Sequence, residues 1–145
     1  MEKKIQAYLY EHIPIARAMG IQVEQAARDK VVLRASFLPN INHKKTVFGG
    51  SLHAVATLAC WSLLYINLEE ESPVQIVITK SDAAYLAPVD DDFRAVCIVP
   101  DGVVWERFLK TLHMRGKGRI HLAAQIAQQG KLCVDYHGVF AAISG

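Results

Sequence analysis

Cysteine is scarce in this sequence, and its placement excludes the common cysteine-based architectures. The 145 residues include three cysteines, Cys60, Cys97 and Cys133, which are widely spaced and odd in number. Neither a disulfide framework nor a zinc-ligand spacing is visible among them. Buried thiols in a reducing compartment are the simpler interpretation. We therefore expect a cytoplasmic protein.

Sequence motifs for metal binding and for serine-based hydrolysis are also missing. The six histidines have no partners at i, i+4 and no carboxylates at ligand spacing. The serines lack a nucleophile-elbow context, because Gly50-Ser51-Leu52-His53 does not match Gly-x-Ser-x-Gly. We expect neither a metal site nor a cofactor.

The excess of charge is small. A formal net charge of +2 argues against nucleic acid as a partner. The basic residues gather locally, at Lys44-Lys45 and in the Arg-Gly-Lys-Gly-Arg segment 115–119. Such short clusters suit a small phosphorylated ligand better than a polymer.

Apolar residues, in contrast, are abundant. They make up 52% of the chain, against 21% charged residues, which predicts one globular domain spanning residues 1–145. This apolar share is high for so small a chain. It indicates a buried oligomer interface in addition to a core.

One long segment, residues 51–68, carries no formal charge and is nearly long enough to cross a bilayer. Strand-like segments follow it at short intervals, and polar side chains interrupt it. These features favour a buried central helix, apolar on nearly all sides, over a membrane span. The interrupting residues are Ser51, His53, Thr57, Ser62 and Asn67.

The other elements follow from hydrophobic periodicity. Helical spacing covers residues 5–19, with Pro14 as a kink or break and Gly20 as a stop. Residues 105–114 are expected to form a short helix or an irregular arm. The predicted strands are 21–28, 30–37, 74–85, 92–99, 117–128 and 131–142. A helix, two strands, a long helix and four strands predict an antiparallel α+β domain.

The long helix opens with a glycine pair, Gly49-Gly50. A helix N-terminus leaves backbone N–H groups unpaired at the positive end of the helix dipole. Such a terminus can hold an anion or the oxygen of a carbonyl that gains negative charge. Asn42 lies in the loop that leads to it. The pattern predicts a protein that polarises a carbonyl group.

Three motifs in order carry a resemblance to a known family. Asn42 stands seven residues before Gly49. Thr46-Val47-Phe48-Gly49-Gly50-Ser51 leads into the long helix, which contains Trp61. Tyr85-Leu86-Ala87-Pro88 ends the third strand. This combination resembles the hotdog-fold acyl-CoA thioesterases, in particular the family typified by the C-terminal domain of YiiD proteins. The resemblance covers essentially the whole chain. It implies an antiparallel sheet wrapped around a long central helix, and dimers or dimers of dimers with sites between subunits.

Two positions depart from the thioesterase pattern. The motif usually has histidine before the glycine pair, where this chain has Phe48. The catalytic aspartate or glutamate usually lies seven residues after the second glycine, where this chain has Thr57. Threonine is not a general base at neutral pH. The resemblance therefore implies the fold and the acyl-thioester site and leaves the base open.

Three side chains are candidates for the missing chemistry, each with a structural alternative. Asn42 is expected to orient water or the thioester, or else to form an Asx turn. Thr57 positions water, or else bonds back to a helix carbonyl. Asp82 supplies the base, across a dimer interface, or else faces solvent. His53 and Ser81 are weaker alternatives as the base.

The expected substrate contacts lie on the glycine turn and on one strand. Phe48 and Ser51 flank the glycine pair, and Lys117 and Arg119 alternate on a strand where they can clamp coenzyme A phosphates. The expected activity is hydrolysis of an acyl-CoA or acyl-carrier-protein thioester. A non-catalytic acyl-thioester binding module and an acyl dehydratase on the same fold remain as alternatives.

Overall fold

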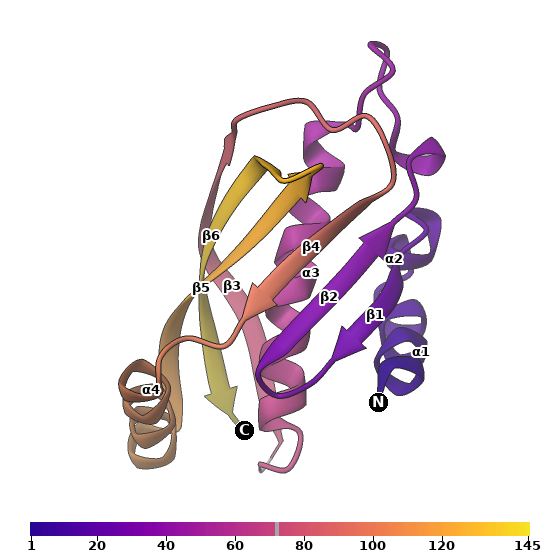
Figure 1. The fold of residues 1–145 in the computed structure, drawn as a ribbon. Helices are drawn as coiled ribbons and strands as arrows, with labels where there is room; N and C mark the ends of the chain where they lie inside the picture. The colour runs from indigo at the N-terminus through magenta and orange to yellow at the C-terminus, as the bar shows by residue number, and fades with distance from the viewer. Residues whose placement is uncertain (72) are drawn as a thin grey trace.

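The computed structural model describes residues 1–71 and 73–145, and it places one long helix, α3 (Gly49–Leu68), against one face of a six-stranded sheet (Figure 1). The strands are β1 (Gln22–Ala26), β2 (Lys30–Ala35), β3 (Val74–Tyr85), β4 (Phe93–Ile98), β5 (Lys117–Gln128) and β6 (Lys131–Ser144). The other helices are α1 (Glu2–His12), α2 (Ile15–Ala18), the single 3₁₀ turn η1 (Leu38–Asn40) and α4 (Gly102–Arg115). The predicted α+β hotdog architecture is confirmed.

The central helix α3 is buried because it carries no charged side chain. A stripe along it stays partly accessible, through Gly50, Thr57, Trp61 and Tyr65. By length and composition α3 resembles a membrane span, but 61% of its most apolar window is buried inside the fold. A helix apolar on nearly all sides is expected at the centre of a wrapped sheet.

Each strand of the sheet pairs antiparallel with its neighbours, in the order β1-β2-β4-β5-β6-β3. Side chains alternate between the two faces, so Ile120 and Leu122 of β5 are buried towards α3. Arg119, which precedes Ile120, and His121, which lies between Ile120 and Leu122, point to the outer face and are exposed. The sheet therefore has one face that packs on the helix and one that does not.

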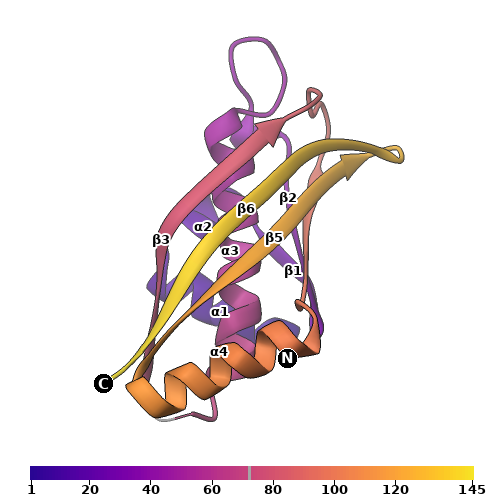
Figure 2. The ribbon, with the colours of Figure 1, turned by 90° about the vertical axis from the view of Figure 1, so that its left-hand side faces the viewer.

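The two edges of the sheet differ. Side chains of α1 cover the edge strand β1, where Val23 N–H donates to Gln6 (2.9 Å) and Ala26 N–H donates to Glu2 (2.8 Å). The other edge strand, β3, pairs only with β6, and Figure 2 shows it along the free side of the sheet. An uncovered edge strand is a ready template for pairing with another chain.

Two helical segments end where local sequence signals, a proline, glycines and a capping aspartate, would place their ends. The first helical stretch is divided at Pro14 and stops at Gly20, which has φ +68°, as predicted. Residues 102–115 form a full helix instead of an irregular arm. Asp101 caps it by accepting from the Val103 (2.8 Å) and Val104 (3.4 Å) N–H groups, and Gly116 ends it at φ +70°.

Two glycines give a matched test of how α4 packs on β5. A Cβ on Gly118 would lie 3.0 Å from the Phe108 carbonyl oxygen, whereas a Cβ on Gly102 would meet nothing within 4 Å. We expect Gly118→Ala to destabilise the protein by about 1–3 kcal/mol, since backbone must move. Gly102→Ala should be neutral or slightly stabilising. Urea unfolding monitored by circular dichroism checks both; equal stability of the two variants would contradict this packing.

Candidate active site at the start of α3

The first turn of α3 is held by two backbone carbonyl groups that come from distant parts of the chain. Phe48 N–H donates to the Asn40 carbonyl (2.8 Å), and Val47 N–H donates to the Val89 carbonyl (2.8 Å). The Asn40 side chain is buried, and its amide donates to the Met19 (2.8 Å) and Ser36 (2.7 Å) carbonyls. Asn40 therefore fixes the position at which the helix begins.

The glycine pair leaves two N–H groups free. Ser51 and Leu52 N–H both donate to the Phe48 carbonyl (2.9 and 3.2 Å), and no side chain caps the helix. Within residues 1–71 and 73–145, nothing accepts a hydrogen bond from Gly49 or Gly50 N–H. These donors lie at the positive end of a 20-residue helix with no acidic residue in its first turn. The turn can therefore stabilise a developing oxyanion.

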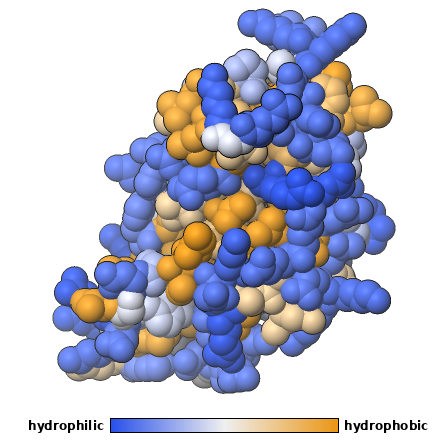
Figure 3. Space-filling model, in the orientation of Figure 1, coloured by the Kyte–Doolittle hydropathy of each residue, from blue (hydrophilic) through white to orange (hydrophobic). Residues whose placement is uncertain are grey.

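An apolar hollow of about 360 Å³ opens beside Gly49. The Tyr85 hydroxyl donates to the Gly49 carbonyl (3.2 Å), which joins the end of β3 to the start of α3. The large apolar side chains of Leu86 and Phe48 lie nearby and are 57% and 58% exposed. Large apolar side chains that gather at the surface often mark a binding site. Figure 3 shows apolar surface at this upper end of the molecule, on both sides of the polar loop. The remaining walls are Val47, Leu52, Ala87, Pro88 and Val89.

Phe48 stands over Gly50. A Cβ added to Gly50 would lie 2.4 Å from the Phe48 ring, so glycine is what allows the ring to lie against the turn. Ser51 is half-buried in the same turn. The structure thus brings together four predicted residues, Phe48, Gly49, Gly50 and Ser51.

Asn42 shapes the loop before α3. Its side-chain oxygen accepts from the Lys44 (2.8 Å) and Thr46 (3.2 Å) N–H groups, and its amide donates to the Thr46 hydroxyl (3.0 Å). This is the Asx-type turn considered as its structural alternative. All of these contacts are local, and Lys45 takes φ +60° inside the loop.

One turn further along α3 lies a polar cluster of four side chains: His53, Thr57, Ser81 and Tyr136. His53 Nε2 is 3.0 Å from the Ser81 hydroxyl of β3. The Thr57 hydroxyl donates to the His53 carbonyl (2.9 Å) and is hydrogen-bonded to the Tyr136 hydroxyl at 2.8 Å. The His53 and Tyr136 rings meet edge to face at 5.2 Å. Thr57 therefore makes the predicted helix back-bond and also a contact across to β6.

Burial raises the pKa of Tyr136, and hydrogen bonding with Thr57 and Ser81 offsets part of that rise. The side chain is fully buried, so the charged phenolate is disfavoured. Tyr136 therefore remains a neutral hydroxyl throughout the neutral pH range. It can hold its neighbours in place, but it does not supply a base.

Asp82 lies on the other side of the sheet. It is exposed, and it pairs in register with His137 of β6, on the face that points away from α3. That face carries a chain of contacts in which His121 Nε2 meets His137 Nδ1 (2.9 Å) and His137 Nε2 meets Asp135 (3.1 Å). Hydrogen bonds from Gln125 and His137 lower the pKa of Asp135. One chain does not bring Asp82 to the glycine turn.

Lys117 and Arg119 are also remote from that turn. They are exposed on the outer face of β5, next to α4, whereas α3 begins at the opposite end of the molecule (Figure 1). A single chain does not place them beside Gly49.

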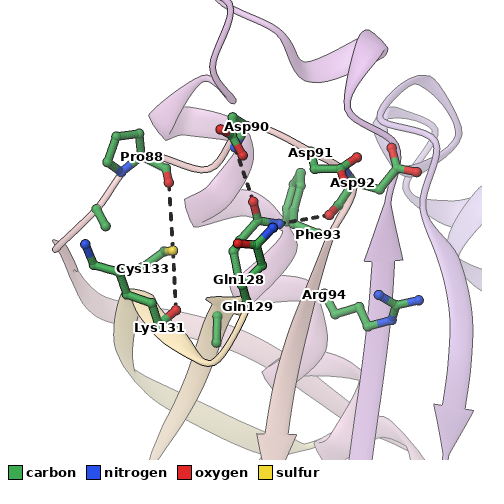
Figure 4. Close-up of a pocket in the computed structure, with 12 residues that line it drawn as sticks. Pro88, Asp90, Asp91, Asp92, Phe93, Arg94, Gln128, Gln129, Lys131 and Cys133 are labelled. Carbon is green, nitrogen blue, oxygen red and sulfur yellow. Dashed lines mark hydrogen bonds between the residues drawn. The ribbon is translucent and has the colours of Figure 1, made fainter.

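A larger hollow, of about 400 Å³, lies between the β3–β4 connection and the β5–β6 turn (Figure 4). Two of its polar residues are already hydrogen-bonded: Gln128 donates to the Asp92 carbonyl (2.9 Å), and the Asp92 carboxylate accepts from Arg34 and from Phe37 N–H outside the hollow. These bonds hold the β3–β4 connection, which carries Val89 to the start of α3. No group of three or more metal-binding side chains is present in the described part of the chain.

Comparison with known proteins identifies the family. A family model described as "Putative thioesterase (yiiD_Cterm)" matches residues 2–144. The chain belongs to this family. The reaction class that this comparison supports is hydrolysis of a thioester. The resemblance seen in the sequence is confirmed.

Solved structures show the same fold over the full length. A Chlorobaculum tepidum protein of unknown function is 34% identical, with a TM-score of 0.92, and the match covers 99% of this chain and 94% of that one. A Shewanella oneidensis protein described as a putative thioesterase is 24% identical, with a TM-score of 0.83 and coverage of 98% and 96%. A Pseudomonas aeruginosa protein described as a probable thioesterase is 18% identical, with a TM-score of 0.84 and coverage of 99% and 95%.

Three features of this site could not be predicted from the sequence alone. Asn40 resembles any loop asparagine until its buried contacts are seen. His53 and Ser81 are 28 residues apart, and only the packing of β3 on α3 places them 3.0 Å apart. Tyr136 alternates with outward residues in β6, which indicates burial but not its contact with Thr57.

Replacement of Tyr136 by phenylalanine tests the polar cluster. We expect Tyr136→Phe to cost about 0.5–1.5 kcal/mol of stability near pH 8, the usual contribution of a hydrogen bond. The folded pKa of Tyr136 is raised above its ordinary 10.0, so its pKa-linked stability is complete below about pH 10 and is lost as pH rises through the folded pKa. The stability difference between wild type and variant should therefore shrink above about pH 10. Urea unfolding at several pH values measures it, and a pH-independent difference would contradict the burial effect.

Proposed function

We propose that this protein hydrolyses acyl thioesters of coenzyme A or of an acyl carrier protein at the start of α3. The observation that carries the proposal is the pair of free N–H groups at Gly49 and Gly50, which lie beside an apolar hollow of about 360 Å³. The hollow suits an acyl chain, and the N–H groups suit the thioester oxygen. The family assignment supports the same reaction class.

The glycine turn acts on the transition state. When a nucleophile adds to the thioester carbon, the carbonyl oxygen becomes an oxyanion, and Gly49 and Gly50 N–H bind it more strongly than the neutral carbonyl. Each such donor typically contributes ~10²–10³ in rate. The donors are backbone groups in a turn that the Asn40 and Val89 carbonyls anchor through Phe48 and Val47 N–H, so no reorganisation is needed during reaction.

Proton transfer falls to His53, one helical turn from the free donors. Its ring contacts the Ser81 hydroxyl at 3.0 Å and is half-buried at the α3–β3 boundary. A histidine imidazole can accept and return a proton in general acid–base catalysis. Asp82, on the outer face of the sheet, has no part in this step. Thr57 acts by holding Tyr136 in position, and Asn42 acts by shaping the loop.

The site is completed by a second copy of the chain. The partly accessible stripe of α3 carries Trp61 and Tyr65 with no charged residue, and the free edge of β3 exposes Val77 and Ile78 (42% and 41%). Edge-to-edge pairing of two β3 strands would cover both surfaces. If that pairing is antiparallel, the Lys117 end of one sheet lies alongside the α3-start end of the other. The basic side chains can then reach the phosphates of a bound coenzyme A.

A second function, binding of acyl thioesters without hydrolysis, is favoured by one observation. The helix position that carries an acid in related enzymes is Thr57, and its hydroxyl is committed to the His53 carbonyl and to Tyr136. A binding module needs the hollow and the free N–H groups but no base. Turnover separates the two functions.

Thiol release from a panel of acyl-CoAs and acyl carrier proteins tests the activity. We expect turnover with a clear chain-length preference, because the hollow has a fixed size. His53→Gln should lower kcat by about 10²–10⁴. His113→Gln is the matched control, since that histidine is exposed on α4 and contacts Glu71. Tight binding of acyl-CoA without turnover would support the binding module, and equal activity of both variants would exclude His53 as the base.

The oligomeric state tests the completed site. We expect sedimentation equilibrium to give at least twice the chain mass of 16.1 kDa. Val77→Lys places a charge on the free edge of β3 and should shift the protein towards monomer with loss of activity. Val103→Lys, at a 65% exposed position of α4, is the control and should leave assembly unchanged. A fully active monomer would contradict an intersubunit site.

A further inference from the structure

The Ser81 hydroxyl contacts the imidazole ring of the proposed base. It lies on β3 and is half-buried, and its oxygen is 3.0 Å from His53 Nε2. We infer that Ser81 is the nucleophile of this site and that hydrolysis passes through an acyl-enzyme ester on its hydroxyl. This inference rests on the proposed thioesterase function. The inference changes the proposed mechanism from direct attack by water to covalent catalysis by Ser81.

The contact between Ser81 and His53 has the geometry of a nucleophile and its base. A serine hydroxyl is a weak nucleophile unless a neighbouring base takes its proton, and heavy-atom distances of ~2.6–3.2 Å allow that transfer. The Tyr136 ring meets the His53 ring edge to face at 5.2 Å and an interplanar angle of 79°, which restrains the imidazole. The Tyr136 hydroxyl is hydrogen-bonded to Thr57 at 2.8 Å, which fixes the Tyr136 ring against His53. The base of the pair is therefore positioned by a buried residue.

The pair lies about one helical turn along α3 from the free N–H groups. Two inward-facing residues of β3 contact the start of the helix in turn: Tyr85 contacts Gly49, and Ser81 contacts His53. His53 is one helical turn beyond Gly49, a rise of ~5.4–6 Å. A thioester whose oxygen is bound by the Gly49 and Gly50 N–H groups can therefore present its carbon to the Ser81 oxygen.

The absence of an acid at position 57 favours this route over direct attack by water. In the described part of the chain, the polar side chains hydrogen-bonded to one another at this point of α3 are His53, Thr57, Ser81 and Tyr136. Thr57 and Tyr136 are neutral at physiological pH and bonded to each other. One base, His53, then remains, and its ring nitrogen is already occupied by Ser81. The hydroxyl that is best placed to lose its proton is that of Ser81.

In the first step, Ser81 Oγ attacks the thioester carbon while its proton passes to His53 Nε2. The carbonyl electrons move to oxygen, and the Gly49 and Gly50 N–H groups bind the oxyanion. When the carbonyl re-forms, the carbon–sulfur bond breaks. The leaving thiolate takes the proton from His53 and departs as the free thiol of the carrier.

In the second step, water attacks the Ser81 ester carbon and gives its proton to His53. The same N–H groups bind the second oxyanion. The carbon–oxygen bond to Ser81 then breaks, and Ser81 Oγ recovers the proton from His53. The products are a carboxylic acid and the original serine, so atoms and electrons balance with water as the only co-reactant.

Acid-quenched turnover followed by intact-protein and peptide mass spectrometry tests the intermediate. The substrate is the acyl-CoA that is turned over fastest in the panel, mixed with the full-length protein. We expect one acyl group per site on Ser81, and partitioning of the acyl group to added hydroxylamine at a product ratio that does not depend on the thiol carrier. Ser81→Cys should carry the acyl group as a thioester on the substituted residue. Ser81→Ala should lose more than ~10³ in kcat and carry no adduct.

Thr79→Ala is the matched control, because Thr79 lies on the same strand and its hydroxyl donates to the Val139 carbonyl (3.0 Å). It should keep wild-type rates and partitioning. If the wild type hydrolyses thioesters but hydroxylamine does not partition the product, or if Ser81→Ala keeps its rate, water attacks directly and the inference is wrong while the hydrolase function stands. If the wild type hydrolyses none of the substrates, the proposed function itself fails.

Discussion

The structure depends on one constraint, the anchoring of the first turn of a buried helix. A helix without charged residues can be placed in many registers inside an apolar core, because dispersion contacts are not directional. Two directional bonds remove that freedom here: the Asn40 carbonyl accepts from Phe48 N–H and the Val89 carbonyl accepts from Val47 N–H. They fix where α3 starts, and so they fix where its free N–H groups point. The polar hollow around Asp92 contributes indirectly, since it holds the connection that carries Val89.

The same anchoring aligns helix α3 with strand β3, although the two elements rise by different distances per residue. A strand advances about 3.3 Å per residue and a helix about 1.5 Å, so a strand that crosses a helix meets it at only a few points. In this chain those points are Tyr85 with Gly49 and Ser81 with His53. The apolar hollow, the N–H donors and the polar pair therefore lie in sequence along one short stretch of contact. A shift of one residue in β3 would turn Ser81 to the outer face, where Asp82 now lies.

Much of this fold could be predicted from the sequence, because its signals are local. Periodicity located the central helix and the strands, and Pro14 and the glycine pair marked helix boundaries. The helix at 102–115 was underestimated, although Asp101 and Gly116 are recognisable caps. The site was harder, because its groups meet only through tertiary packing. The glycine turn follows from a motif, whereas the partner of His53 and the face occupied by Asp82 depend on the pairing register of β3 with β6.

The threonine at position 57 provides a hydrogen bond to a buried residue without placing a charge in the core. Tyr136 is fully buried, and a buried phenol needs a hydrogen-bond partner. A carboxylate at position 57 would meet that need only as an acceptor, and burial would disfavour its charged form. Thr57 satisfies Tyr136 and the His53 carbonyl at once and carries no charge. The neutral arrangement leaves His53 and Ser81 in contact with each other, and in the mechanism that we propose proton transfer is confined to this pair.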